Sequence, residues 1–98
     1  MGKVIFTISY EIKPEKRDEY LSLTREMKEY FNTINKRDYS IFEQKGRKNG
    51  FTEIFIFNNI DEFNQLDDND ERMTELVQKL ESLLMDGKMK YTTLIEIE

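Results

Sequence analysis

The 98-residue chain contains no cysteine, no histidine and no tryptophan. Without cysteine there are no disulfide bonds and no thiol nucleophiles, and without histidine there is no imidazole base and no ordinary zinc site. The chain also has only one proline and four glycines, which is too little loop-forming sequence for a long linker. These absences exclude several classes of enzyme chemistry before any motif is considered.

The charge balance is acidic, with 20 Asp and Glu residues, 15 Lys and Arg residues and a net charge of −5. A nucleic-acid partner requires a basic face, so none is expected. The one basic cluster, Lys45, Arg47 and Lys48, is interpreted as an exposed hairpin tip. No segment approaches the roughly 20 apolar residues of a membrane span, and the N-terminus lacks a signal-peptide core. We therefore expect a cytoplasmic protein with no membrane partner.

The order of the hydrophobic periodicities predicts the fold. Period-2 and 3.6-period runs follow one another as strand, helix, strand, tight turn, strand, helix, strand along most of the chain. This order is typical of an α+β, ferredoxin-like split βαββαβ sandwich, which is a four-stranded antiparallel sheet with helices on one face. The length favours a single domain with one core over residues 1–98.

Four strands are predicted over residues 3–12, 39–44, 51–57 and 89–98. The second is the weakest and is expected at an edge of the sheet, whereas the aromatic and β-branched third strand is expected inside it. Either Gly46 or Asn49-Gly50 can supply the positive φ angles for a tight turn between them.

Two long helices and one short helix are predicted. The first begins at Pro14 and runs to about Asn35. Its inward stripe is Tyr20, Leu23, Met27, Tyr30, Phe31 and Ile34. Asn59 and Asp68 each stand three residues before a glutamate, so they predict capped starts for a short helix near 60–66 and a longer one near 69–85. The longer helix has its stripe at Met73, Leu76, Val77, Leu80, Leu83 and Leu84 and is expected to stop at Gly87.

The face of the sheet that points away from the helices is unusually apolar. In a lone domain of this architecture that face meets water and should be mostly polar. Here it includes Ile5, Phe42, Ile54, Ile56 and Leu94. Such a patch favours an interaction surface, and we expect a homodimer formed through this sheet face. The alternative is a monomer with scattered exposed apolar residues.

A pocket between sheet and helices would be bounded by the inward-facing residues Ile8, Met27, Phe55, Phe63 and Met73. These residues predict an apolar pocket for a flat, hydrophobic small molecule. The methionines can also be interpreted as filling gaps in the core. No residue spacing identifies a catalytic group.

Two further groups of residues are candidate sites. The acidic run Asp67, Asp68, Asp70 and Glu71 lacks the spacing and the glycine of a calcium loop, so it is interpreted as helix capping and no metal is expected. The tyrosines can orient or protonate a ligand, although core packing is the commoner reason for such residues. They are Tyr10, Tyr20, Tyr30, Tyr39 and Tyr91.

Particular segments carry a resemblance to a known family. They are Ile12-Lys13-Pro14-Glu15-Lys16 at the start of the first helix, Glu19-Tyr20-Leu21 within it, and FTEIFIF followed by Asn58-Asn59-Ile60-Asp61-Glu62-Phe63. With these segments the chain resembles the dimeric α/β-barrel superfamily, and within it the antibiotic-biosynthesis-monooxygenase-like proteins. The resemblance implies barrels built from two sheets face to face, and pockets between each subunit's sheet and helices.

The functional expectations from this resemblance are narrower. It implies cofactor-independent oxygenation of electron-rich polycyclic phenols, which react with oxygen once they are deprotonated. The family's haem-degrading branch uses an asparagine, a tryptophan and a histidine, so haem degradation is not expected in this chain. Glu15 stands where the family commonly has glycine, and no histidine stands near Leu66 and Asp67 to act as a base.

Two hypotheses stay open, and the sequence does not decide whether the protein is an enzyme. The first is a small-molecule oxygenase that uses no cofactor, or a descendant that has lost the activity. The second is a non-catalytic ligand-binding or structural dimerisation module. A cavity of several hundred cubic ångströms with a convergent polar group would favour the enzyme, and a filled core would favour the module.

Overall fold

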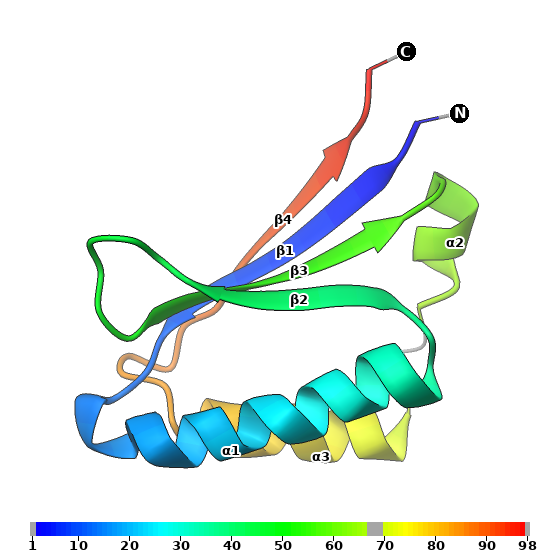
Figure 1. Ribbon diagram of the computed structural model, residues 1–98. Helices are drawn as coiled ribbons and strands as arrows, with labels where there is room; N and C mark the ends of the chain where they lie inside the picture. The colour runs from blue at the N-terminus through cyan, green and yellow to red at the C-terminus, as the bar shows by residue number, and fades with distance from the viewer. Residues whose placement is uncertain (1, 67–69, 98) are drawn as a thin grey trace.

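The computed structural model describes residues 2–66 and 70–97, which form an open sheet covered on one face by helices (Figure 1). The elements in chain order are β1 (Val4–Glu11), η1 (Pro14–Lys16), α1 (Arg17–Lys28), η2 (Glu29–Ile34), β2 (Asp38–Glu43), β3 (Gly50–Phe57), α2 (Ile60–Asn64), α3 (Glu71–Glu81) and β4 (Lys90–Ile95). All strand pairs are antiparallel, in the order β2-β3-β1-β4. The predicted ferredoxin-like arrangement is confirmed, with the second strand at an edge and the third inside the sheet.

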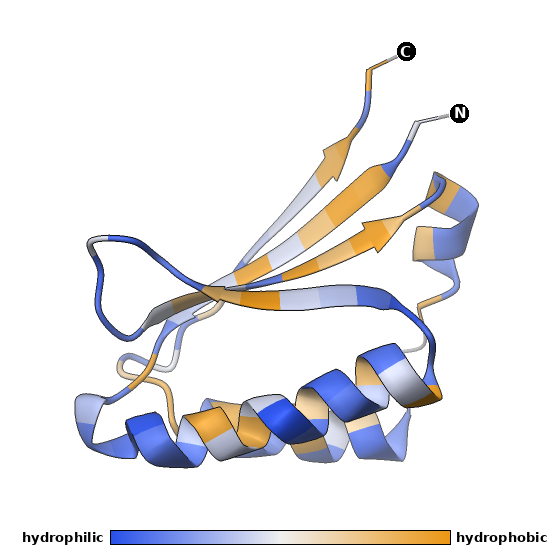
Figure 2. Ribbon diagram, viewed as in Figure 1, coloured by the Kyte–Doolittle hydropathy of each residue, from blue (hydrophilic) through white to orange (hydrophobic). Residues whose placement is uncertain are grey.

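The helices α1 and α3 lie side by side under the sheet, and α2 stands near the end of β3 (Figure 1). Charged groups connect the two long helices, because Glu26 on α1 accepts hydrogen bonds from Arg72 at 3.1 Å and from Lys79 at 3.2 Å. Hydrophobic residues concentrate along β1 and β3, whereas the turn between β2 and β3 is hydrophilic (Figure 2). A single chain does not close into a barrel, so any barrel requires a second sheet.

The first helical stretch has the predicted extent but a different character at its end. It begins with a 3₁₀ turn at Pro14, continues as α1, and finishes as the π-helix η2. A π turn contains more residues than an α turn, so the angular position of each side chain shifts. Tyr30 and Phe31 stay buried, but Ile34 is 62% exposed, and its prediction as an inward residue is wrong.

The helices after β3 are capped as the pattern suggested, with one change. Asn59 Oδ1 accepts a hydrogen bond from the Glu62 backbone N–H at 2.8 Å, which confirms the first cap. The predicted cap Asp68 lies outside the described residues. The cap seen at the start of α3 is Asp70, whose Oδ1 accepts from the Arg72 N–H at 2.8 Å.

The predicted stop of the last helix at Gly87 is wrong, because α3 ends at Glu81. The chain leaves the helix to pair with the end of β1: the Lys13 N–H donates to the Leu83 carbonyl and the Met85 N–H donates to the Glu11 carbonyl, both at 2.9 Å. Gly87, at φ +71°, belongs to the turn that leads into β4. The short helix α2 also ends two residues before the predicted boundary.

The sheet face opposite the helices carries the predicted apolar residues, alongside threonines and serines. Ile5, Ile54 and Ile56 are half-buried in the single chain, and Phe42 and Leu94 are 55% and 52% exposed. The expected hairpin tip, residues 45–48, is exposed. Among the described residues, no helix has the length and apolar content needed to cross a membrane.

Candidate functional site

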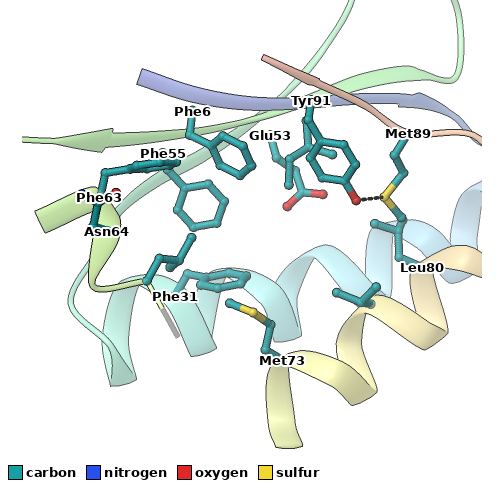
Figure 3. Close-up of a pocket in the computed structure, with 13 residues that line it drawn as sticks. Phe6, Phe31, Glu53, Phe55, Phe63, Asn64, Met73, Leu80, Met89 and Tyr91 are labelled. Atoms are coloured by element: carbon teal, nitrogen blue, oxygen red, sulfur yellow. Dashed lines mark hydrogen bonds between the residues drawn. The ribbon is translucent and has the colours of Figure 1, made fainter. Parts of the chain in front are cut away.

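A cavity of about 490 Å³ lies between the sheet and the helices. Its wall is built by residues from every layer of the fold (Figure 3). These residues are Phe6, Ile8, Phe31, Glu53, Phe55, Phe63, Asn64, Leu66, Met73, Val77, Leu80, Met89 and Tyr91. Most of them are apolar, so the cavity suits a hydrophobic ligand.

Four of the five residues predicted to bound a pocket line this cavity: Ile8, Phe55, Phe63 and Met73. The fifth, Met27, does not. Its side chain is buried on α1, and its Sδ lies 3.9 Å from the hydroxyl of Tyr39 on β2. Met27 therefore packs against Tyr39 and does not line the cavity.

Aromatic rings form much of the wall. The Phe6 ring centroid lies 5.6 Å from that of Phe63 and 6.0 Å from that of Tyr91, with which it is stacked. Phe31 meets Phe55 edge to face at 4.9 Å. Tyr91 is 59% exposed, so the cavity opens to solvent beside β4. Flat ring faces at such spacings are suited to a planar, aromatic molecule.

Of the carboxyl groups that the structure describes, the one that enters this apolar space is that of Glu53. Glu53 on β3 is only 3% exposed, and Figure 3 shows its carboxyl group pointing from the sheet toward the helices. Its Oε1 accepts a hydrogen bond from the Tyr39 hydroxyl at 2.7 Å. Its Oε2 is buried and has no hydrogen-bond partner. A buried oxygen without a partner is costly, so it marks the place where a ligand group would bind.

Burial raises the pKa of Glu53, because the charged form loses its hydration. Interactions with the Tyr10 and Tyr39 hydroxyls act in the opposite direction but are weaker. A carboxyl group with a raised pKa is a stronger base when ionised and a ready acid when protonated. Glu53 is thus the residue of the cavity that is best suited to proton transfer.

The sequence contains a signal for Glu53, although no pattern in it was interpreted as a catalytic group. In FTEIFIF, Glu53 belongs to the same alternating set as Phe51, Phe55 and Phe57. That set is buried toward the helices. A glutamate in the middle of a buried aromatic face is rarely tolerated unless it has a partner or a task. Its strand position alone was therefore enough to mark it as a candidate.

The described residues hold no group of three or more Asp, Glu, His or Cys side chains that could bind a metal ion. Asp67 and Asp68 of the acidic run lie outside the described residues. Of the other two, Asp70 caps α3 and also accepts a hydrogen bond from the Tyr30 hydroxyl, while Glu71 begins the helix.

No protein-family model matches this sequence, and no curated protein matches it. Solved structures do match its fold. A conserved protein from Methanosarcina mazei Go1 superimposes with a TM-score of 0.81 at 17% identity, covering 96% of this chain and 92% of the other. An antibiotic biosynthesis monooxygenase matches with a TM-score of 0.72 at 23% identity, covering 100% and 98%.

A variant of SnoaB, a cofactor-independent oxygenase from Streptomyces nogalater, also matches. Its TM-score is 0.74 at 12% identity, and the match covers 96% of this chain and 92% of SnoaB. At such identities the likeness establishes the fold. The chain therefore has the fold seen in antibiotic biosynthesis monooxygenase-like proteins.

Proposed function

We propose that this protein, which has the fold of the antibiotic biosynthesis monooxygenase-like proteins, oxygenates a flat phenolic small molecule with O₂ and without a cofactor. The observation that supports the proposal most is the apolar cavity of about 490 Å³ that contains the buried carboxyl group of Glu53, whose Oε2 has no partner. A cavity of this size with a convergent polar group favours the enzyme hypothesis over the non-catalytic module. We also propose, as the sequence predicts, that residues 1–98 form a single domain and that the protein is cytoplasmic.

The chemistry begins with a proton transfer to Glu53. A phenol bound with its hydroxyl at Oε2 gives up its proton to the carboxylate, and the resulting phenolate can transfer an electron to O₂. For a polycyclic phenol with a CH₂ carbon in its ring system, the carbon becomes a carbonyl group and two C–H bonds are lost. One atom of O₂ enters that carbonyl group and the other leaves as water, with both substrate hydrogens, so all electrons come from the substrate.

The wall of the cavity suits this class of ligand. The rings of Phe6, Phe55 and Tyr91 offer faces and edges against which a planar molecule can lie. A phenolic hydroxyl can donate to the ionised form of Glu53 and accept from the protonated form, so it can pair with either. A ketone pairs only with the acid, and an ammonium group pairs well only with the carboxylate.

The test is an oxygenation assay with a hydroxyanthrone such as dithranol, under ¹⁸O₂, with quinone formation followed above autoxidation. We expect the native protein to insert one labelled oxygen atom, and Glu53→Gln to lower kcat/KM by roughly a hundredfold or more. Glu43→Gln is the matched control on the same hairpin and should retain the activity. Native protein that consumes no O₂ with any anthrone or phenol of a panel would overturn the proposal.

Ligand binding is tested separately, by fluorescence or calorimetry with the same anthrone. Met73→Trp places a bulky indole ring in the cavity and should abolish binding. Met85→Trp, at a surface position that is 52% exposed, should not affect binding. Tight binding that is lost in Met73→Trp, together with absent turnover, would assign the non-catalytic ligand-binding module instead.

We also propose that two copies associate through the sheet face that points away from the helices. The support is the apolar character of that face, where Phe42 and Leu94 are both more than half exposed in the single chain. Light scattering at micromolar concentration should give twice the mass of the chain. Ile54→Glu, in the middle of the face, should give monomers, whereas Leu21→Glu on α1 should remain dimeric. A native particle of single-chain mass would contradict this association.

A further inference from the structure

Glu53 belongs to a buried cluster with three tyrosines that come from three different elements. Tyr39 on β2 donates its hydroxyl hydrogen to Glu53 Oε1 at 2.7 Å. The Tyr10 hydroxyl on β1 lowers the pKa of the same carboxyl group, and it lies 2.7 Å from the hydroxyl of Tyr20 on α1. All four side chains are buried, at 6% exposure or less. Buried polar groups thus form a connected cluster within an otherwise apolar layer.

Within the described part of the chain, no cation compensates the charge of Glu53. The groups that act on its carboxyl group are the Tyr10 and Tyr39 hydroxyls, and among the described ion pairs none involves Glu53. From the other elements, α3 presents Met73 and Leu80 to the cavity, and α2 presents Phe63 and Asn64. Among the described residues that line the cavity, the only titratable group besides Glu53 is Tyr91 on β4, whose hydroxyl lies 3.3 Å from the Met89 sulfur.

We propose that Tyr39, Tyr10 and Tyr20 are positioning residues for Glu53, which hold Oε1 on the strand side, leave Oε2 directed at the cavity, and stabilise the carboxylate in place of a cation. The inference rests on the proposed function in so far as Glu53 is the base. The cluster itself exists without a substrate and can be measured without one.

The hydroxyl hydrogens determine how the cluster works. Each tyrosine has one such hydrogen, so Tyr10 can donate to Glu53 only if Tyr20 donates to Tyr10. In that arrangement the ionised carboxylate is stabilised by the direct hydrogen bond from Tyr39 to Oε1 and by Tyr10, whose hydroxyl is oriented by Tyr20, while Oε2 keeps no partner. Burial raises the pKa of Tyr10, Tyr20 and Tyr39, so these hydroxyls remain neutral donors and do not compete as bases.

This arrangement balances two opposing effects on one carboxyl group. Burial alone favours the protonated acid, which cannot accept a proton from a substrate. Hydrogen bonds to the charged form favour the carboxylate, and fixed hydroxyl donors provide them without the geometric freedom of a lysine or arginine. The tyrosines therefore determine how much of Glu53 is ionised at a given pH.

The test is an infrared titration of the ligand-free protein. The C=O stretch of a protonated carboxylic acid is followed against pH, and the band of Glu53 is identified by its absence in Glu53→Gln. We expect the titration midpoint of Tyr39→Phe to lie about one pH unit above that of the native protein, because one donor to the carboxylate is lost. Tyr10→Phe should shift the midpoint in the same direction, and Tyr20→Phe should shift it less.

Tyr30→Phe is the matched control, because it also removes a buried tyrosine hydroxyl that donates to a carboxylate, but that carboxylate is Asp70. It should leave the Glu53 band unchanged. Where Tyr39→Phe fails to fold, Tyr10→Phe applies the same test from β1. An unchanged midpoint in the folded variants, or an equal shift in Tyr30→Phe, would overturn the inference.

The pH profile of kcat/KM with the hydroxyanthrone adds a second measurement. The rise of kcat/KM with pH that reports the ionisation of Glu53 should shift to higher pH in Tyr39→Phe, by the same amount as the infrared midpoint. The two proposals fail differently. Absent turnover with a shifted infrared midpoint contradicts only the oxygenase function, whereas turnover that depends on Glu53 with an unshifted midpoint contradicts only the tyrosine cluster.

Discussion

Two glutamates of one hairpin show how differently the same side chain is used. Glu43 ends β2, and its carboxylate accepts two hydrogen bonds from the Arg17 guanidinium, at 2.7 and 2.9 Å, and one from the Asn49 backbone N–H, at 2.9 Å. Glu53 lies in the middle of β3, opposite Ile41, with a tyrosine on one oxygen and nothing on the other. The first carboxylate is fully paired at the surface, and the second is half paired in the interior.

Their pKa values shift in opposite directions for this reason. The hydrogen bonds from Arg17, with that from the Asn49 N–H, lower the pKa of Glu43 to about 2. Burial raises the pKa of Glu53. The charged form of Glu43 stabilises the fold, whereas the charged form of Glu53 opposes it, and a group kept against stability is a candidate for function.

The largest effect is expected from Glu53→Gln. Folded Glu53 binds its proton more tightly than unfolded Glu53, so the free energy of unfolding falls as pH rises above the ordinary value of 4.5, and levels off above the raised pKa. Removing the charge should make the variant more stable than the native protein on the alkaline side, by about 1–3 kcal/mol. Urea unfolding at a series of pH values measures this difference.

The control for that experiment is Glu43→Gln, which should change stability in the opposite direction. If Glu53→Gln proves less stable than the native protein at alkaline pH, the buried carboxylate is not a cost to the fold, and the contrast between the two glutamates is lost.

A smaller effect is expected at Asn49, which connects the hairpin to α1. Its φ is +67°, and its Oδ1 accepts from Arg17 at 2.8 Å. Asn49→Gly loses the side-chain hydrogen bond but keeps the backbone conformation, whereas Asn49→Ala also incurs strain. Asn49→Ala should therefore be less stable than Asn49→Gly by about 1 kcal/mol in thermal or urea unfolding. Equal stabilities would show that the backbone conformation at this position contributes nothing.

The strands could be predicted from sequence because alternation is a local property. In β1 and β3 each side chain's face follows from its neighbours two positions away, and the observed strands agree with the predicted ones within a few residues. The ends of the helices could not be predicted in this way. Ile34 is displaced by a π turn, and α3 stops early because the following residues pair with β1. The early end of α3 depends on a contact distant in sequence, the bridge between Ile12 and Leu84.

The cavity shows the same limit at the level of the site. Alternation places Glu53 on the inner face, but only the assembled fold shows that Phe63 and Met73 leave space in front of it. Met27 has the same periodicity as a cavity residue, yet it packs against Tyr39. Whether an inward residue meets a neighbour or an empty space is decided by the packing of α2 and α3, which no local pattern records.

The smallest effect is expected at the Arg17 and Glu43 pair, because both side chains are about one-third exposed and solvent screens them. The folded-state pKa of Glu43 lies below its ordinary value of 4.5, so its stabilisation is present above that pH and is lost as pH falls toward 2. In Arg17→Met the free energy of unfolding should therefore fall less steeply as pH decreases toward 2. Added salt should make the same decrease less steep in the native protein. Lys16→Met is the control, since Lys16 pairs with Glu19 only at 3.7 Å and should leave this decrease unchanged. A decrease that stays equally steep in Arg17→Met would mean that Glu43 is held by the Asn49 N–H alone, and the contrast with Glu53 would then depend on burial and not on a partner cation.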